Sequence, residues 1–551
     1  MVLTSIILLF GCSKDFLDMN QPGVRTLAEF YKTDDDATAA VMSCYNMMMA
    51  LQASTWTSFW MTKESLSDDI YTGGESAGDR PEYQELNTFT FGPTNGPITN
   101  VYRYMCMIIY RANMIVDNFK EPTPYQKAVI AEAKAIRAYM YFELATLYGP
   151  VPLVLHELLP SEYAQPNSTM DGLWAQIEKD LNEAIADLPL KSKMKAAGFD
   201  ICRFSKGTAQ GFLGKALLFE KKYAASAAAF AALIATNEYS LYTLADLGGD
   251  ITQLLRKSTE FGKESLFEVS YSSNRKNDWS NPYGDNFVDP SRTNPSNFIW
   301  QLCGPRQDQG FSGPSDSMVV GGVKVPRPGY AQIANRGGWG FGYPTLDIWK
   351  AYKDAGDSVR LHGAIQTVSQ LIALGGTLGN GGNYMWGCPG LVRLKYTTWA
   401  SETNILTGVA EIQYGTNLRI MRYADVLLMA AEANLNVGGS NVATATDQIN
   451  QVRTRVNLPA LATVTMADIK LERRLELSFE GSRYQDLVRW GDAATVLKDQ
   501  GKSIPTGRLI NGVLQYNTNP AAGFKAPQNN MFPIPFNEIS SNPNVKQNPG
   551  Y

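Results

Sequence analysis

The stretch KGTAQGFLGKALLFEKKYAASAAAFAALI, residues 206–234, contains the pattern that decides the fold. Gly214 is followed by the aromatic residues Tyr223 and Phe230 and then by Leu233. A small residue allows two helices to cross closely, and aromatic side chains fill the gap between the paired helices. The stretch therefore predicts two helices that pack against each other.

This order of small and aromatic residues resembles a tetratricopeptide repeat, in which helix pairs stack into a scaffold. Ser226 departs from the pattern, because the repeat prefers alanine at that position. The apolar stripes of such helices are interpreted as core packing, so they indicate a framework rather than a catalytic surface.

Helical patterns extend over most of residues 34–260. Acidic residues open the first helix, and Gly149 followed by Pro150 ends a long one. A third predicted helix, capped near Ser168 or Thr169, repeats apolar residues every four positions and so has one buried stripe. The predicted helices cover residues 34–52, 124–149 and 168–189, and a late helical hairpin covers 422–439 and 443–457.

Composition narrows the classes of function. The chain has 551 residues, of which 44% are hydrophobic and 19% charged, as in a folded protein. Its net charge of −4 gives no electrostatic case for binding nucleic acid. After the first dozen residues no apolar run approaches the ~18–20 residues that a membrane span needs. The six cysteines contain no C-x-x-C pair, and buried free thiols are expected for those beyond Cys12.

The first residues predict a membrane anchor rather than a core strand. An apolar segment, residues 2–10, is followed by Gly11 and Cys12, where a bacterial lipoprotein signal would be cleaved before the cysteine. Acyl groups on Cys12 would then tether the protein. No lysine or arginine precedes the apolar run, so the signal looks shortened. A buried first strand is the alternative.

The middle of the chain differs from both ends. Residues 261–416 are rich in glycine, proline, asparagine and aromatic residues, with motifs such as RGGWGFGYPT that lack a helical period. Long loops are usually functional or disordered, and many Trp and Tyr residues argue against disorder. We therefore expect ordered loops that present aromatic side chains.

Several stretches together resemble the SusD/RagB family of Bacteroidetes outer-membrane nutrient-binding lipoproteins. They occur in order from Cys12 to Tyr551. They are CSKDFLD (12–18), PTLDIWKAYKDAGDSVR (344–360), LRIMRYADVLLMAAEANLNVG (418–438), ERRLELSFEGSRYQDLVRWG (472–491) and FPIPFNEISSNPNVKQNPGY (532–551).

The resemblance implies a mainly α fold, with a tetratricopeptide-like scaffold of helix pairs supporting a large irregular, loop-rich region. It also implies capture of an oligosaccharide or other nutrient on the extracellular side of the outer membrane. The ligand would pass to a SusC-like TonB-dependent transporter, without catalysis. The expected segments are a signal peptide (1–11), a tether (12–33), a helical region (34–260), a ligand-binding region (261–416) and a C-terminal region (417–551), with 34–551 forming one unit.

Loop aromatics are the candidate ligand contacts, because an aromatic ring stacks on the C–H face of a sugar. Arginine and asparagine suit the sugar hydroxyls. Trp339 is the first choice, since its flanking glycines allow a tight turn that exposes the ring. The further candidates are Trp300, Trp279, Tyr283, Trp386, Arg80, Tyr83 and Asn100.

Two alternative functions remain open at this point. The chain contains no H-E-x-x-H or Walker A motif, yet a glycan-degrading enzyme needs only two carboxylates about 5–10 Å apart. A tetratricopeptide scaffold that binds protein segments is the other alternative. No cofactor is expected, since Asp68 and Asp69 lack the alternating spacing of a calcium loop.

The charge-dense residues 472–491 predict a structural network of salt bridges rather than an active site. Glu472, Glu476 and Glu480 are spaced four residues apart, so on a helix they share one face and need cationic partners. Arg474, Arg483 and Arg489 are the expected partners, and the network is expected to hold this helix against the C-terminal segment.

Overall fold

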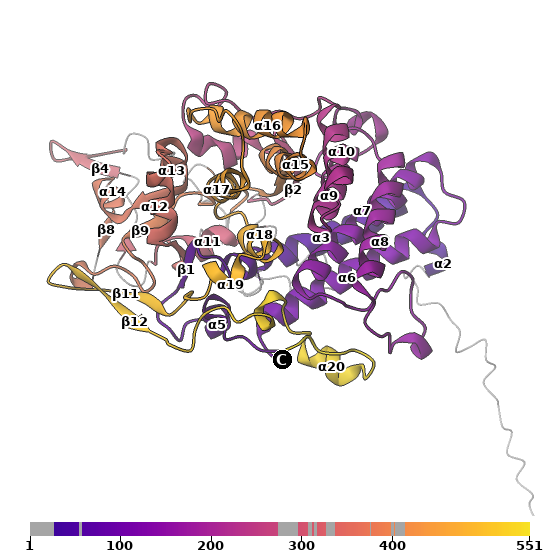
Figure 1. The fold of residues 1–551 in the computed structure, drawn as a ribbon, viewed down its shortest axis with the longest axis horizontal. Helices are drawn as coiled ribbons and strands as arrows, with labels where there is room; N and C mark the ends of the chain where they lie inside the picture. The colour runs from indigo at the N-terminus through magenta and orange to yellow at the C-terminus, as the bar shows by residue number, and fades with distance from the viewer. Residues whose placement is uncertain are drawn as a thin grey trace, which may run out of the picture.

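The computed structural model confirms a mainly α-helical protein (Figure 1). It describes residues 27–53, 58–273, 296–306, 311–312, 317–326, 337–374, 376–378, 380–397, 402 and 414–551. Cys12, the expected lipid attachment site, lies outside these residues. No helix in the described part of the chain is long and apolar enough to cross a membrane.

The first half of the chain forms a row of long helices, each packed against the next along the chain (Figure 1). Thr123 and Gln126 form a capping box at the start of the longest one, and Gly149 follows its end in a left-handed conformation, as the sequence predicts. The helices are α3 (Asp34–Ala53), α6 (Gly96–Asn118), α7 (Pro124–Leu147), α8 (Met170–Asp187), α9 (Lys206–Phe219) and α10 (Tyr223–Ile234).

The α9–α10 pair confirms the close helix crossing. A Cβ atom added to Gly214 would lie 2.5 Å from the ring of Phe230, which is fully buried. Ser226, the departure from the repeat pattern, donates a hydrogen bond from its hydroxyl to the Gly214 carbonyl at 2.8 Å. The serine therefore adds a polar link between the two helices at the point where they are closest.

The late helices complete the scaffold. α15 packs against both α9 and α10, so a hairpin from the end of the chain extends the early row of helices (Figure 1). The C-terminal helices are α15 (Tyr423–Val437), α16 (Asn441–Arg455), α17 (Met466–Glu476), α18 (Arg483–Trp490), α19 (Ala493–Val496) and α20 (Phe536–Ser541).

Short elements fill the rest of the fold. The remaining α-helices are α2 (Leu27–Phe30), α4 (Phe59–Glu64), α5 (Pro81–Thr88), α11 (Ile299–Cys303), α12 (Leu346–Asp354), α13 (Ser358–Ala364) and α14 (Val368–Ala373). The strands are β1 (Ile70–Gly73), β2 (Ser265–Val269), β3 (Phe311–Ser312), β4 (Ser317–Val320), β5 (Val323–Pro326), β6 (Phe341–Pro344), β7 (Ile365–Thr367), β8 (Thr377–Leu378), β9 (Leu391–Arg393), β10 (Leu418–Arg422), β11 (Ser503–Ile510) and β12 (Val513–Thr518).

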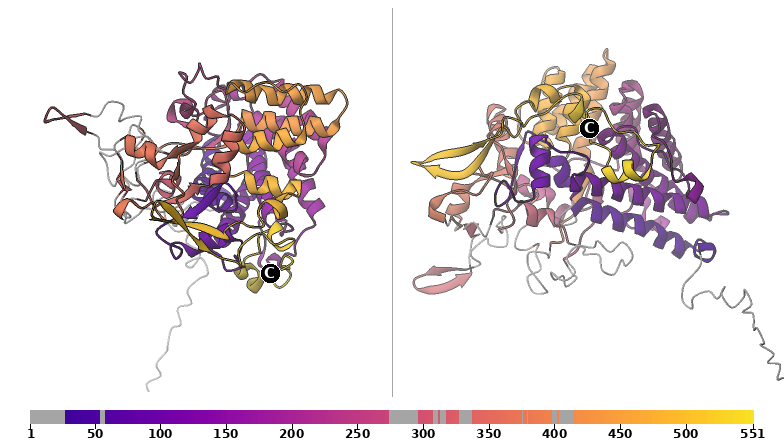
Figure 2. Two further views of the ribbon diagram at one scale, coloured as in Figure 1. Left: turned by 60° about the vertical axis from the view of Figure 1, so that its left-hand side comes forward. Right: turned by 90° about the horizontal axis from the view of Figure 1, so that it is seen from below.

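These strands form antiparallel pairs rather than a continuous sheet. The pairs among the described residues are β1–β6, β2–β10, β3–β8, β4–β5, β7–β9 and β11–β12. The β4–β5 and β11–β12 hairpins project from the same end of the molecule (Figure 2). The irregular region expected between residues 261 and 416 thus contains short helices and strand pairs beside its loops.

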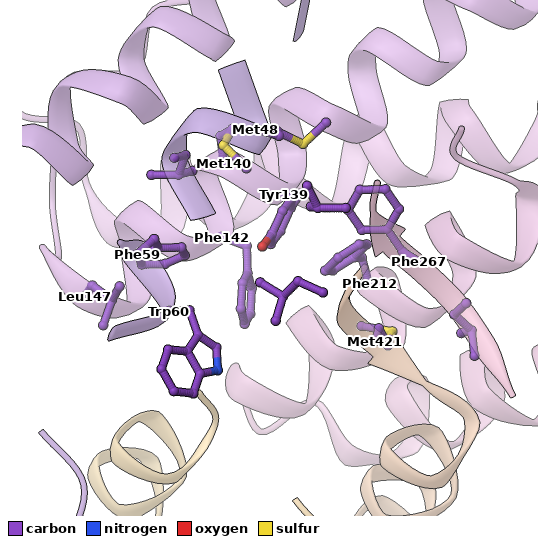
Figure 3. Packing of buried hydrophobic residues seen from close by; sticks show 14 of the residues in the cluster. Met48, Phe59, Trp60, Tyr139, Met140, Phe142, Leu147, Phe212, Phe267 and Met421 are labelled. Carbon is purple, nitrogen blue, oxygen red and sulfur yellow. The ribbon is translucent and has the colours of Figure 1, made fainter. Parts of the chain in front are cut away.

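One hydrophobic cluster joins the helical row to the strands, with members from Ala37 to Val545. At its centre Tyr139 of α7 stacks on Phe212 of α9, with ring centroids 4.6 Å apart (Figure 3). Phe267 of β2 lies edge-on to the Tyr139 ring. Aromatic pairs in these geometries add about 0.5–1.5 kcal/mol beyond their burial, so the β2–β10 pair is fixed on the helices.

The predicted salt-bridge network exists and is buried, and Glu476 lies at its centre. This carboxylate pairs with Arg422 at 2.6 Å, with Arg360 at 3.0 Å and with Arg455. Arg360 is the last residue of the family-like stretch 344–360, and it also pairs with Glu472 at 2.6 Å. The network therefore links α17 to α13, to β10 and to α16.

The partners predicted for this network were wrong. Arg474 and Arg483 pair with Asp68, and Arg489 pairs with Glu432. Arg474 lies two residues from Glu476, so it points away from the glutamate face of α17. The helix also ends at Glu476 itself. Among the described residues the three glutamates pair with cations of β10, α13 and α16 and with Lys395, rather than with the C-terminal segment.

The expectation of free thiols is confirmed for the described residues, and the expectation of burial holds for three of the five. All five cysteines beyond Cys12 are free thiols, three of them buried and two partly exposed.

We expect replacing Glu64 by glutamine to flatten the pH dependence of stability. Its carboxylate is buried, accepts a hydrogen bond from the Gly481 amide, and has one oxygen without a partner among described atoms. Burial raises the pKa of Glu64 to about 7, against a smaller opposing effect of Arg393. Between about pH 4.5 and 7 the folded protein therefore holds a proton that the unfolded chain has lost, and stability falls as pH rises.

The measurement is the urea midpoint of unfolding at pH 5 and at pH 8. From pH 5 to pH 8 the free energy of unfolding should fall more in the wild type than in Glu64→Gln, by about 1–3 kcal/mol. This range follows because a shift of one pKa unit corresponds to ~1.4 kcal/mol. The exposed Glu121→Gln is the control and should behave as the wild type does. Parallel pH profiles for the wild type and Glu64→Gln would contradict the prediction.

Candidate functional site

A tight pair of strands, β1 and β6, brings the early and middle loops together. Gly73 is opposite Phe341 in this pair, and the Gly74 amide donates a hydrogen bond to the Gly340 carbonyl at 2.7 Å. A Cβ atom on Gly73, whose φ is +73°, would lie 2.0 Å from that carbonyl oxygen. Only glycine fits there, because the two backbones are in contact and the φ angle is left-handed.

Three of the predicted ligand contacts lie in segments that meet at this end of the strands. Trp339 directly precedes Gly340, and its ring is half-buried against the core. Arg80 precedes α5, at the end of the loop that leaves β1, in a left-handed conformation with φ of 48°. Trp386 is half-buried beside Gly387, where an added Cβ atom would lie 2.6 Å from Cα of Gly73.

Asn100 belongs to the start of α6, which hydrogen bonds hold against α5. Asn95 caps α6, and its amide donates to the Glu82 carbonyl and to the Glu85 carboxylate, each at 2.9 Å. Glu82 also pairs with Arg80 at 2.9 Å. Asn100, half-buried one turn further along α6, is thus tied through Asn95 and Glu82 to the segment that carries Arg80.

Arg306 was missed by the sequence analysis, and it connects the two loops. Its guanidinium donates to Asp79 at 2.7 Å, to Glu75 at 3.3 Å and to the Trp339 carbonyl at 3.1 Å. The Arg306 amide also donates to the Tyr343 hydroxyl at 3.2 Å. No local signal reveals this role, because the paired residues are 227 and 231 positions apart.

Two predicted contacts are in the core instead. Tyr83 is 1% exposed, and its hydroxyl accepts a hydrogen bond from the Ser58 amide. Trp300 is 3% exposed and stacks on Tyr396, with ring centroids 5.4 Å apart. Tyr83 lies on the inner face of α5, and Trp300 lies in the short helix α11 that enters the core. In this structure neither ring is available to a sugar, so we remove both from the candidates.

The other two aromatic candidates, Trp279 and Tyr283, lie outside the described residues. The aromatic candidates that remain among the described residues are therefore Trp339 and Trp386.

The acidic pair considered for calcium is engaged by arginines. Asp68 pairs with Arg483 at 2.7 Å and with Arg474 at 2.9 Å, and Arg474 also pairs with Asp69 at 2.8 Å. Burial raises the pKa of Asp68, but the two guanidinium groups outweigh it and hold this pKa below its usual range. Within the described ranges no group of three or more His, Cys, Asp or Glu residues could hold a metal ion.

Comparison with protein families identifies the chain. The profile described as "SusD family" matches residues 263–551, more than half of the sequence. The chain belongs to the SusD family. A second SusD-like profile, described as "Starch-binding associating with outer membrane", matches residues 15–218.

Individual SusD-family proteins match along their whole length. "SusD-like protein P38" of Formosa agariphila is 24% identical, over 100% of this chain and 98% of its own. The solved "Laminarin binding SusD-like protein" has a TM-score of 0.75 and 28% identity, over 95% of this chain and 100% of its own. "Surface glycan-binding protein A" of Bacteroides thetaiotaomicron, solved with laminarihexaose, has a TM-score of 0.72 and 20% identity, over 94% and 100%. This last likeness shows the fold alone.

Proposed function

We propose that this protein binds an oligosaccharide or polysaccharide at the cell surface and delivers it to a SusC-like TonB-dependent transporter, without catalysing a reaction. Membership of the SusD family supports this function, as does likeness to a protein named for laminarin binding. The family description of association with the outer membrane supports the location.

The observation that carries the proposal is that the segments bearing Trp339, Trp386 and Arg80 meet at the end of the β1–β6 pair. Two indole rings and a guanidinium supply both kinds of contact that a sugar needs. The rings bury C–H faces, and the guanidinium donates to hydroxyl oxygens. The Arg306 guanidinium donates a hydrogen bond to the carbonyl of Trp339, so the backbone at Trp339 is held in place before a ligand binds.

The proposed anchor is a set of acyl groups on Cys12, facing the extracellular side of the outer membrane. Each buried CH₂ group of an acyl chain contributes ~0.8 kcal/mol to membrane binding. Mass spectrometry of the protein from its native host tests this anchor. An acylated N-terminal Cys12 supports it, and an unmodified Cys12 on a chain that still carries Met1 contradicts it.

Laminarihexaose, a laminarin oligosaccharide, is the first ligand to test, because a similar solved structure is named for laminarin binding. We expect Trp339→Ala to weaken binding of the recognised glycan about tenfold, since the loss of one stacking ring removes about 1–1.5 kcal/mol. Isothermal titration or an affinity gel measures this change.

Trp349→Ala is the matched control. Trp349 is also half-buried, but it lies in α12, beyond the opposite end of β6. Its replacement should leave glycan affinity within about twofold. Equal affinities for Trp339→Ala and the wild type would reject the site assignment.

A screen for glycan binding and for product release tests the function itself. The wild type should bind a glycan and leave it intact. Release of reducing ends from the bound glycan would favour a degrading enzyme. No binding to any member of a glycan array would favour the protein-interaction scaffold.

A further inference from the structure

A cavity of about 360 Å³ opens beside α6, away from the β1–β6 pair. Its walls come from α6, α7, α20 and residues 151–165, and Figure 1 shows α20 below α6. Tyr102, in its floor, lies two residues after the candidate Asn100 on α6, and side chains two apart on a helix do not share a face. The volume falls within the range of about 300–1,000 Å³ typical of small-molecule sites.

Four tyrosines from three parts of the chain line this tyrosine cavity. Tyr102 and Tyr141 are buried in its floor, where their rings face the space together with aliphatic side chains. Tyr110 and Tyr163 lie at the mouth and are 50% and 64% exposed. Exposed tyrosine rings at the mouth of a cavity offer flat, weakly negative surfaces to a ligand.

The charged groups of the cavity are acidic. Glu157 and Glu538 line it, and no lysine or arginine of the described chain does. Burial and then the neighbouring Glu157 raise the pKa of Tyr110, so this carboxylate lies near the Tyr110 hydroxyl. His156 is the one basic side chain in the described lining. Its Nε2 atom lies 3.5 Å from the carboxylate of Glu162, a residue that does not line the cavity.

Glu538 is the more unusual of the two acids. It is partly buried on α20, and burial raises its pKa, with no neighbouring cation acting against this effect. Most half-buried carboxylates are stabilised by a cationic partner or by amide donors. The described chain provides neither a cation nor an amide donor for the Glu538 carboxylate. A cationic group of a ligand would therefore stabilise its charged form.

We propose that the tyrosine cavity is a second small-molecule site, which selects an amine-bearing, cationic ligand of about one or two sugar rings. Tyrosine faces attract an ammonium group through the ring quadrupole, and the attraction grows as the group leaves water. Glu157 and Glu538 supply the compensating negative charge. The aliphatic floor packs against the apolar face of the ligand body.

The test compares disaccharides that differ at one kind of group. Diglucosamine carries two amines, cellobiose carries hydroxyls in their place, and N,N′-diacetylchitobiose carries neutral amides. Isothermal titration at pH 6, with the full chain, should show diglucosamine binding at least tenfold more tightly than either neutral sugar. Its affinity should fall as salt rises from 50 to 300 mM, because exposed charges are screened. Equal binding of all three sugars, or no binding of diglucosamine, would overturn the proposal.

Two substitutions locate the binding. Glu538→Gln keeps the side-chain shape and should weaken diglucosamine binding at least fivefold, and Tyr110→Ala should weaken it to a similar degree. Glu121→Gln, an exposed glutamate away from the cavity, should have no effect. Circular dichroism checks that each variant is folded. Unchanged diglucosamine affinity in folded Glu538→Gln and Tyr110→Ala would place the binding elsewhere and refute the site.

Discussion

Replacing Glu476 by alanine should lower the free energy of unfolding by about 3–5 kcal/mol, the usual result of breaking a buried ion pair from one side. Arg360, Arg422 and Arg455 all pair with this carboxylate, and each is almost completely buried. Without Glu476 these cations would face one another in the core with less compensating charge. Urea unfolding followed by tryptophan fluorescence measures the loss.

Glu183→Ala is the matched control for this prediction. Glu183 pairs with Lys134 at 2.7 Å, but its side chain is 42% exposed. An exposed pair of this kind contributes at most about 1 kcal/mol, so the control should remain close to the wild type. Equal losses for Glu476→Ala and Glu183→Ala would show that burial of the network does not set its contribution.

The same network predicts a response to acid. Burial raises the pKa of Glu476, but Arg455, Arg422 and Arg360 outweigh it and hold this pKa well below the usual range. The stability contributed by Glu476 is therefore complete above about pH 4.3, the ordinary glutamate value, and is lost as pH falls through its folded pKa. The difference between the wild type and Glu476→Ala should narrow in strong acid.

Replacing Phe532 by alanine should also cost about 3–5 kcal/mol of stability, because it leaves a cavity in the aromatic core. Its ring is completely buried, and its centroid lies 5.3 Å from Tyr148, 5.7 Å from Phe91 and 6.4 Å from Tyr484. The Phe532 amide also donates to the Leu147 carbonyl at 2.6 Å. This residue therefore joins the C-terminal tail to α7 and α18.

Phe536→Ala provides the comparison within the same tail. Phe536 lies four residues further along and is 57% exposed, so its removal should change stability by less than about 0.5 kcal/mol. Thermal or urea unfolding of the two variants should separate them clearly. If Phe532→Ala is as stable as Phe536→Ala, the tail does not hold the helices together.

Local patterns predicted the helices well. The long helix expected at residues 124–149 occupies Pro124–Leu147, and the one expected at 168–189 occupies Met170–Asp187, capped by Thr169. Each of these signals acts within a few residues: a cap, a stop, or a stripe repeated every turn. Such signals can be recognised in the sequence without knowledge of the rest of the fold.

The ligand contacts of the candidate site stay a prediction, and the structure tests only where their segments lie. Trp339, Trp386 and Arg80 lie in segments that meet at the β1–β6 pair, as expected of binding loops, whereas Tyr83 and Trp300 are in the core. Aromatic residues in loop-like sequence look alike whether they are exposed or buried. Their exposure depends on which distant segment covers them, and this cannot be predicted from the neighbouring residues in the sequence.

The sequence by itself determined the helical scaffold, the SusD-like motifs and the need for a salt-bridge network around residues 472–480. Only the tertiary structure decided the partners. All arginines carry the same guanidinium group, so the sequence does not show which of them pairs with Glu476. The fold places Arg360 and Arg422 within hydrogen-bond distance of Glu476, and it places Arg474 beside Asp69. Ion pairing and ring burial depend on distances of a few ångströms between remote segments, which only the folded chain fixes.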